Sequence, residues 1–219
     1  FGVGASLAVS GAIIQSILKN PLASPYTLGV SSGASLGVGI YIVLGISIPV
    51  IGNLAMPIIG FLCGVLTVFA VIIFSNKVDR GLSNNTVILA GMVLSLFTSA
   101  MLTTITALCS EDIKAITMWQ MGSFAMKSWS YVFAGIPFFI IGIFMVIRYT
   151  REMDILSFGE EGAKAIGVET KKVKKTLLVS VAILTGSAVA LSGVIGFIDL
   201  ITPHIVRKIF GSNHKIVDR

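Results

Sequence analysis

Residues able to carry covalent or metal chemistry are few in this chain and do not cluster. The two cysteines, Cys63 and Cys109, have neither CxxC nor Cys/His spacing, so we expect small packing residues rather than ligands or a disulfide. His204 stands alone beside Pro203, which favours a structural role over metal or haem binding. No GxxxxGKS/T phosphate loop occurs. The residue types therefore predict no catalytic centre, no metal site and no cofactor.

The elements that must position the polar residues are long and apolar. Hydrophobic residues make up 55% of the 219 residues and charged residues 12%, and the mean hydropathy is +0.96. No charged side chain occurs between Asn20 and Asn76, although a bilayer span takes only about 20 apolar residues. We predict an all-α polytopic membrane protein, one domain over 1–219, with spans at 2–18, 28–44, 54–74, 86–108, 129–147 and 176–198.

The distribution of Lys and Arg predicts the orientation of these spans. Loops on one side hold Lys114 and Lys127, whereas loops on the other side hold Lys19, Lys77, Arg80, Arg148, Arg151, Lys164, Lys171, Lys172, Lys174 and Lys175. The larger set is expected in the cytoplasm. The basic residues after 206 would then lie outside, unless a short helix near Pro203 re-enters the bundle. Because basic residues follow the loops rather than one exposed face, no nucleic-acid partner is expected.

None of the six expected spans has an ionisable residue near its middle. Proton- and sodium-coupled carriers usually keep such residues at depth, because an ion-binding group must be there. An intramembrane protease or a redox protein would need clustered His, Asp or Cys residues. We therefore predict that the chain forms a transport pathway and that the energy source is another polypeptide.

A short internal echo predicts two related halves. Residues 4–11 (GASLAVSG) recur as 186–193 (GSAVALSG), and in the same gapless register Pro21 falls on Pro203 and Gly29 on Gly211. Five charge-poor stretches separate the two starts, so the copies should cross a bilayer in opposite directions. Inverted repeats around a central pathway are common in transporters.

Small and polar residues near the interrupted helices give a candidate pathway. Small residues, frequent in 4–11 and 33–39, let helices approach closely, as tight packing or as a moving interface. The candidate pathway residues are Gln15, Asn20, Pro21, Ser31, Ser32, Pro203 and His204. The alternative for the polar ones is that they satisfy backbone groups freed by nearby prolines.

Charged residues concentrate in 151–175, which predicts a cytoplasmic knob of two short helices. Ser157 and Glu160 fit a capping box, Gly167 suits a left-handed stop, and Thr170 can cap the helix that leads into the last span. The knob is either an interfacial linker whose lysines meet anionic lipid or a docking element for a soluble partner.

Four segments resemble the FecCD-type permeases, which are membrane subunits of ATP-binding-cassette importers for iron–siderophore complexes, haem and cobalamin. They are 20–34 (NPLASPYTLGVSSGA), 89–95 (LAGMVLS), 119–124 (WQMGSF) and 193–207 (GVIGFIDLITPHIVR), in order along nearly the whole chain. The resemblance implies a BtuC-like inverted-repeat permease with ten helices, of which this chain holds helices two to seven and the start of the eighth. Asp199 stands where the family more often has Gly.

The resemblance also implies that 159–168 forms the coupling helices seated on an ATPase subunit, within the cytoplasmic segment 151–175. The coupling residues carried over are Gly159, Glu160, Glu161, Ala163, Lys164, Ala165, Gly167 and Val168. The aromatic-rich segment 119–129 would be either an interfacial belt or a gate beneath a docked binding protein.

The implied protein is a multi-pass component of a bacterial cytoplasmic membrane and is not itself an enzyme. Its implied partners are an ATP-binding-cassette ATPase, an extracytoplasmic substrate-binding protein, a second permease subunit and the lipid bilayer. The implied cargo is an iron–siderophore-type chelate, with haem or cobalamin as alternatives. An ion-coupled secondary transporter and a non-transporting scaffold are the alternatives from other classes. Since Phe1 falls inside an apolar stretch, we expect a piece of a longer protein.

Overall fold

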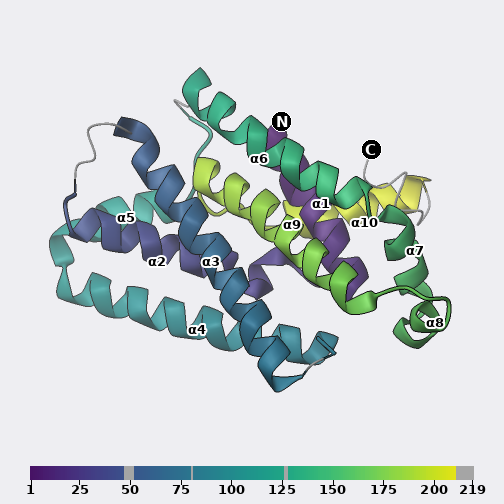
Figure 1. Ribbon diagram of the computed structural model, residues 1–219. Helices are drawn as coiled ribbons and strands as arrows, with labels where there is room; N and C mark the ends of the chain where they lie inside the picture. Colours follow the sequence, from purple (N-terminus) through teal and green to yellow (C-terminus); the bar gives the residue numbers. More distant parts are fainter. Residues whose placement is uncertain (47–51, 80, 126–127, 211–219) are drawn as a thin grey trace.

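The computed structural model describes residues 1–46, 52–79, 81–125 and 128–210, and within these ranges every regular element is a helix (Figure 1). The short 3₁₀ helices are η1 (Pro25–Leu28), η2 (Gly52–Leu54) and η3 (Ser110–Asp112). The α-helices are α1 (Gly2–Leu18), α2 (Val30–Val43), α3 (Ala55–Val78), α4 (Asn84–Leu108), α5 (Ile113–Gln120), α6 (Trp129–Ile147), α7 (Thr150–Phe158), α8 (Glu160–Ala165), α9 (Thr170–Ser192) and α10 (Ile198–Phe210). The all-α prediction is confirmed.

Five of the predicted spans coincide with α1, α2, α3, α4 and α6 to within a few residues. In the described ranges, four helices are long and apolar enough to cross a bilayer, namely α3, α4, α6 and α9. The apolar helices α1 and α2 are shorter, with 17 and 14 residues. At about 1.5 Å per residue, α2 alone does not cross a hydrocarbon core of about 30 Å.

The sixth predicted span, 176–198, begins within α9 as expected, but its predicted end is wrong. The helix α9 begins at Thr170 and stops at Ser192, because Gly193 adopts φ 76 and ψ −168, a conformation that favours glycine. The apolar residues 194–197 that follow are not helical. Hydropathy could not reveal this stop, since the residues on both sides of Gly193 are equally apolar.

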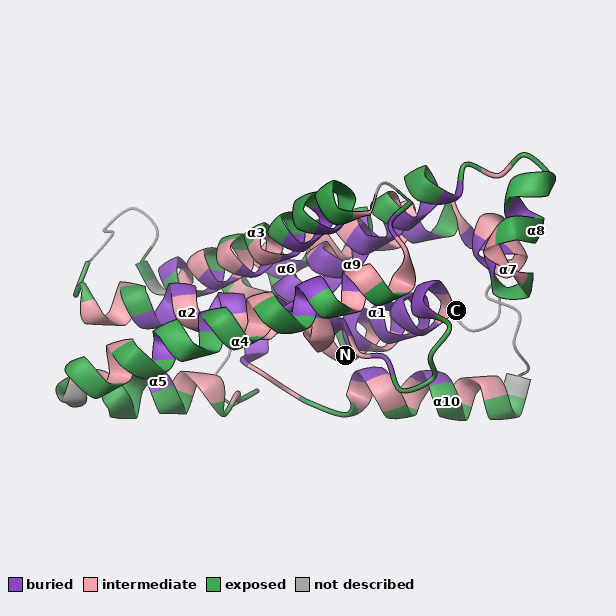
Figure 2. Ribbon diagram, turned by 90° about the horizontal axis from the view of Figure 1, so that it is seen from below, coloured by how far each residue is buried: buried purple, intermediate pink, exposed green. Residues whose placement is uncertain are grey.

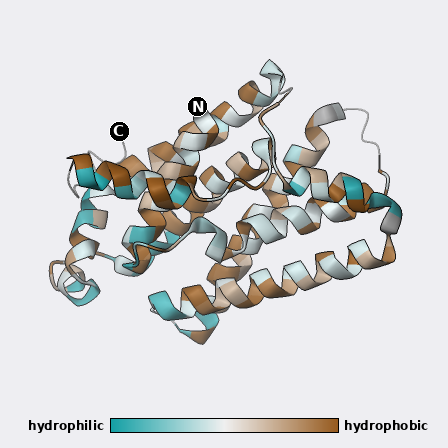
Figure 3. Cartoon of the chain, turned by 180° about the vertical axis from the view of Figure 1, so that it is seen from behind, coloured by the Kyte–Doolittle hydropathy of each residue, from teal (hydrophilic) through white to brown (hydrophobic). Residues whose placement is uncertain are grey.

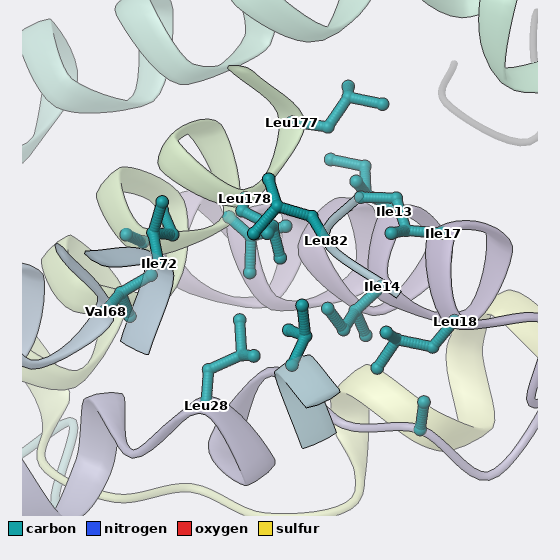
Figure 4. Packing of buried hydrophobic residues seen from close by; sticks show 14 of the residues in the cluster. Ile13, Ile14, Ile17, Leu18, Leu28, Val68, Ile72, Leu82, Leu177 and Leu178 are labelled. Atoms are coloured by element: carbon teal, nitrogen blue, oxygen red, sulfur yellow. The ribbon is translucent and has the colours of Figure 1, made fainter. Parts of the chain in front are cut away.

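The helix α9 is the centre of the bundle and packs on α1, α3 and α6. Of its most apolar 18-residue window 72% is buried, against 22% for α4 and 17% for α6, so α4 and α6 form the outer faces (Figure 2). Leu177 and Leu178 of α9 meet Ile13 and Ile14 of α1 and Ile72 of α3 in the buried cluster of Figure 4. Hydrophilic residues gather on α7 and α8 (Figure 3).

Small residues allow close helix contacts, as the sequence predicted. A Cβ added at Gly33 or Gly37 of α2 would overlap Thr67 or Cys63 of α3. A Cβ at Gly11 of α1 would overlap the backbone carbonyl of Asp199 at the start of α10. The thiol of Cys63 is therefore a packing group against α2, and both cysteines are free.

The helix α10 returns along α1. It starts beside Gly11, in the middle of α1, and its Arg207 lines a cavity together with Lys19 and Ser157 at the end of α1. We call this end of the molecule, which also holds α7, α8 and the α3–α4 turn, the basic end. A short helix containing Pro203 is thus present as predicted, and it brings Arg207 to the same end as Lys19, as the re-entering alternative expected.

The gapless repeat register does not join equivalent structures. Residues 4–11 lie inside α1, which continues to Leu18, whereas 186–193 are the last residues of α9 and the break after it. Pro21 follows the end of α1, but Pro203 lies within α10. The proposed partner of Gly29, Gly211, is outside the described residues.

Candidate functional site

Two glycines mark the ends of segment 159–168, which we call the coupling element after the role that the resemblance implies for it. Gly159, at φ 145 and ψ 145, separates α7 from α8, and Gly167, at φ 87, ends the turn after α8 in the predicted left-handed conformation. The predicted capping box is wrong, because α7 runs through Ser157, whose Oγ donates to the carbonyl of Asp154 at 2.6 Å. Thr170 is the first residue of α9 rather than its cap. The helix expected at 171–175 is the beginning of α9 itself.

The coupling element has an inner and an outer face. Ala163 is buried in the core cluster, and Val168 is half-buried and packs against that cluster. The side chains of the outer face are exposed and belong to Glu161, Lys164 and Ala165, with Gly167 beside them. On this face Lys164 pairs with Glu160 at 3.4 Å.

Glu160 faces inward and meets a buried lysine. The Nζ of Lys174 donates to Glu160 Oε2 at 2.6 Å, to Asn84 Oδ1 at 3.0 Å and to the carbonyl of Leu82 at 3.3 Å. The Lys174 side chain is 4% exposed and that of Glu160 is 27% exposed. These contacts join α8, α9 and the α3–α4 turn, and we call them the Lys174 junction.

The Lys174 junction keeps Glu160 ionised. Burial raises the pKa of the Glu160 carboxyl, but the hydrogen bond and the charge of Lys174, aided by Lys164, outweigh burial and hold that pKa below its ordinary value. The sequence analysis counted Lys174 as one of several loop lysines. Helical spacing could have revealed it, since Thr170, Lys174, Leu177 and Val181 share the buried face of α9.

Five of the seven candidate pathway residues line two separate cavities. Ser31 and Ser32 line a cavity of about 370 Å³ between α2, α4 and α5, together with Ser35, Ser99, Leu102, Thr103, Gln120 and Val194. Ser32 also accepts a hydrogen bond from Thr98 at 2.8 Å and donates to the carbonyl of Gly29 at 3.2 Å. Five of the lining side chains are hydroxyls, so this cavity offers many weak hydrogen bonds and no charge.

Gln15, Asn20 and Pro21 line the second cavity, of about 280 Å³, at the basic end with Ser16, Lys19, Ser157 and Arg207. Asn20 Oδ1 accepts from the backbone N–H of Leu22 at 2.9 Å, which satisfies backbone next to Pro21. Asn20 therefore fits the alternative given for these polar residues, namely that they satisfy backbone groups near the prolines.

Gln15 of α1 reaches a backbone carbonyl of α10 that Pro203 leaves without its helical partner. Proline has no N–H, so Pro203 leaves the carbonyl four residues earlier, that of Asp199, without its helical donor. Gln15 Nε2 donates to this carbonyl over a long 3.5 Å, while Gln15 Oε1 accepts from Arg207 at 2.5 Å. Together with Gly11, these residues form what we call the α1–α10 seam.

Asp199 is an ionisable residue that the sequence analysis did not expect inside the bundle. Its side chain is 1% exposed, and one oxygen accepts from Ser24 Oγ. The other oxygen, Oδ1, has no hydrogen-bond partner in the described part of the chain. The family-typical glycine is dispensable here, since Asp199 is not among the described residues with positive φ. The sequence did not predict this burial, because residue 199 reaches the middle of α1 only through the tertiary packing of α10 against α1.

The two candidate pathway residues on α10, Pro203 and His204, differ in exposure. Pro203 is buried and His204 is exposed on α10. Among the described residues no group of three or more His, Cys, Asp or Glu side chains could hold a metal ion.

A bundle of apolar helices, four of them in the described ranges long enough to cross a bilayer, is the architecture of a polytopic membrane protein. The model of the FecCD transport family matches residues 1–217, and the chain belongs to this family. The resemblance predicted from the four segments is thereby confirmed.

Individual relatives are similar over nearly the whole chain. The uncharacterized ABC transporter permease protein YvrB of Bacillus subtilis (strain 168) is 43% identical over 97% of this chain and 60% of its own length. The hemin transport system permease protein HmuU of Yersinia pestis is 35% identical over 97% of this chain and 64% of its own length. The Fe(3+)-citrate import system permease protein YfmD of Bacillus subtilis (strain 168) is 34% identical over 98% of this chain and 62% of its own length.

A solved ABC transporter structure in an inward-facing conformation has the same fold. It superposes with a TM-score of 0.87 at 30% identity, over 99% of this chain and 68% of the other. The chain spans about three fifths of the length of the curated relatives described above.

Proposed function

We propose that the protein containing this chain is the permease subunit of an ATP-binding-cassette importer for iron–siderophore-type metal chelates, with ATP hydrolysed by a separate subunit. The observation that carries this proposal is the coupling element, a short helix and turn with an outer face exposed at the basic end and an inner face joined to α9 and the α3–α4 turn by Lys174. A motor that pushes on the outer face would move these elements together.

The hydroxyl-lined cavity at Ser31 and Ser32 is the part of the pathway that this proposal favours. A bulky chelate must pass without being held, and neutral hydroxyls bind more weakly than charges do. The large exposed apolar side chains of α4 and α6 are suited to lipid or to a second permease subunit. We place the protein in the bacterial cytoplasmic membrane, with the basic end inward and a substrate-binding protein at the opposite end.

The substrate class is suggested by relatives named for ferric citrate and iron uptake, while others of similar identity are named for hemin, cobalamin and molybdate. The decisive experiment reconstitutes the full-length permease with its ATPase and binding protein in liposomes. Iron–siderophore chelates, haem and cobalamin are then compared as stimulators of ATP hydrolysis and uptake. Stimulation by ferric chelates alone supports the proposal, and stimulation by haem or cobalamin alone would move the substrate class accordingly.

One observation favours an ion-coupled carrier as the second candidate, and that is buried Asp199. The two candidates differ in their energy source. Uptake that persists when ion gradients are collapsed but stops without ATP excludes the carrier. Uptake driven by a gradient without the ATPase, and lost in Asp199→Asn, would replace the proposed function.

A further inference from the structure

Lys174 uses all the hydrogen-bonding capacity of a lysine in a buried place. An ammonium group has three N–H donors, and Lys174 has three acceptors within 3.3 Å, on Glu160, Asn84 and Leu82. The acceptors belong to α8, to the first residue of α4, and to the turn that precedes α4. A single side chain of α9 thus joins segments that are 14, 90 and 92 residues away along the chain.

The burial of this lysine is costly unless the site is complete. Taking an ammonium out of water is repaid only when an opposite charge and well-placed hydrogen bonds replace its hydration. Glu160 supplies the charge, at 2.6 Å, and the two oxygen acceptors of the turn complete the shell. The site therefore resists the departure of any one of its three partners.

The α3–α4 turn is itself held in an unfavourable backbone conformation. Leu82 has φ 53, in the left-handed region that costs a residue with a Cβ free energy. Its side chain is 1% exposed and lies near Leu178 and Ile14 in Figure 4. Its carbonyl is the one that Lys174 binds. Core packing and Lys174 together keep the turn in place.

Beyond the Lys174 junction, α8 packs on α7 and α9, and its more extensive contacts with described helices do not include α3 or α4. Ala163 is buried against the core, and Gly167 lies in the short turn between α8 and α9. The remaining polar contact, from Thr170 Oγ1 to Glu160 Oε1, is long at 3.5 Å. The position of α8 relative to the α3–α4 turn thus depends on the Lys174 junction.

We propose that Lys174 is a positioning residue that makes α8, α9 and the α3–α4 turn move as one body, so that displacement of the coupling element reaches α3 and α4. This inference rests on the proposed function. The Lys174 side chain is buried, so its role is to pass on the motion of α8 rather than to bind a partner.

The test uses the full-length permease, with its ATPase and binding protein, in liposomes. The variants are Lys174→Met and Asn84→Ala, which keeps the lysine but removes its acceptor on α4. The matched control is Lys172→Met on the same helix, because the Lys172–Glu169 pair is exposed and 3.8 Å long. Two readouts are taken: molecules imported per ATP hydrolysed, and the distance between spin labels at Asn85→Cys and Ile166→Cys, with Cys63 and Cys109 replaced by Ala.

We expect Lys174→Met to lower import per ATP by about fivefold or more, a typical size for coupling between sites, while ATP hydrolysis continues. Asn84→Ala should give a smaller loss, and Lys172→Met none. The label distance should be single in the parent protein and broad in Lys174→Met. If Lys174→Met keeps both the parental import ratio and the parental distance, the inference is overturned.

Other results separate this inference from the proposed function. If Lys174→Met does not assemble, Asn84→Ala decides: an unchanged import ratio and distance there overturn the inference. If the parent complex shows no ATP-driven import of cargo, the proposed function fails. The distance between the two spin labels then tests by itself whether Lys174 holds the segments together.

Discussion

The Lys174 junction and the α1–α10 seam hold helices together by different means. At the junction the charges are paired and every donor of Lys174 has an acceptor. At the seam Gly11 meets the Asp199 carbonyl, Arg207 donates to the neutral Gln15, and one oxygen of the Asp199 side chain has no hydrogen-bond partner in the described part of the chain. The difference indicates that the seam depends on shape and the junction on charge. Shape should therefore govern folding at the seam, and pH should act mainly at the junction.

The largest expected effect comes from adding bulk at the seam. Gly11→Val should destabilise the protein by about 3 kcal/mol or more, because the new side chain meets backbone that cannot rotate away. Gly4→Val, on the same helix with nothing within 4 Å of its Cβ, is the control. Thermal unfolding in detergent measures both. Equal stability of the two variants would mean that the close contact is not obligatory.

The next largest effect is expected at Gly167, next to the junction. Gly167→Val should cost about 1–3 kcal/mol locally, because a residue with a Cβ is strained at φ 87. It should uncouple ATP hydrolysis from uptake without unfolding the bundle. Gly162→Val is the control, since both positions are open and Gly162 is helical without positive φ. Parental uptake per ATP in Gly167→Val would argue against a fixed coupling element.

A smaller effect should appear as a pH dependence of the junction. The folded-state pKa of Glu160 lies below the unfolded value, taken as 4.5, so its stabilisation is complete above that value and is lost as pH falls through the folded pKa. A spin label at Ala165→Cys should therefore gain mobility only in acid. In Glu160→Gln the mobility should be higher at neutral pH and nearly independent of pH. Acid-induced mobility that survives Glu160→Gln would assign the effect to another group.

The smallest effect is expected from neutralising Asp199. Asp199→Asn keeps an oxygen for Ser24 and removes a buried charge without a paired cation among the contacts described above, so stability should change by less than about 1 kcal/mol or increase. Glu160→Gln, the same change at the junction, should destabilise. Chemical unfolding of the two variants side by side provides the comparison. A larger loss for Asp199→Asn would show that the seam also depends on charge.

The sequence predicted those features that follow from local composition. Apolar length located α1 to α4 and α6, and the left-handed Gly167 followed from its place after a short helix. Helices α5 and α7 were missed, since both are short and of mixed polarity. Ser157 matched a capping pattern but lies inside α7, because a cap is defined by where the helix begins.

The candidate site was predictable as a set of residues but not as an arrangement. Glu160 and Gln15 were singled out, yet their partners, Lys174 and Arg207, were counted only as loop charges. Both contacts join segments distant along the chain. The spacing of residues along the chain does not predict such contacts. Lys174 is an exception, because a charged residue on an apolar helical face indicates a buried partner.

Pro203 gives the seam an interdependence that is not visible in either helix alone. Its missing N–H leaves a carbonyl on α10 that the amide of Gln15, on another helix, reaches. An ordinary residue at 203 would reclaim that carbonyl and make the amide redundant, whereas loss of the amide would leave the carbonyl orphaned. Substitutions at positions 15 and 203 should therefore occur together, because Gln15 can be lost without cost only after Pro203 has been replaced.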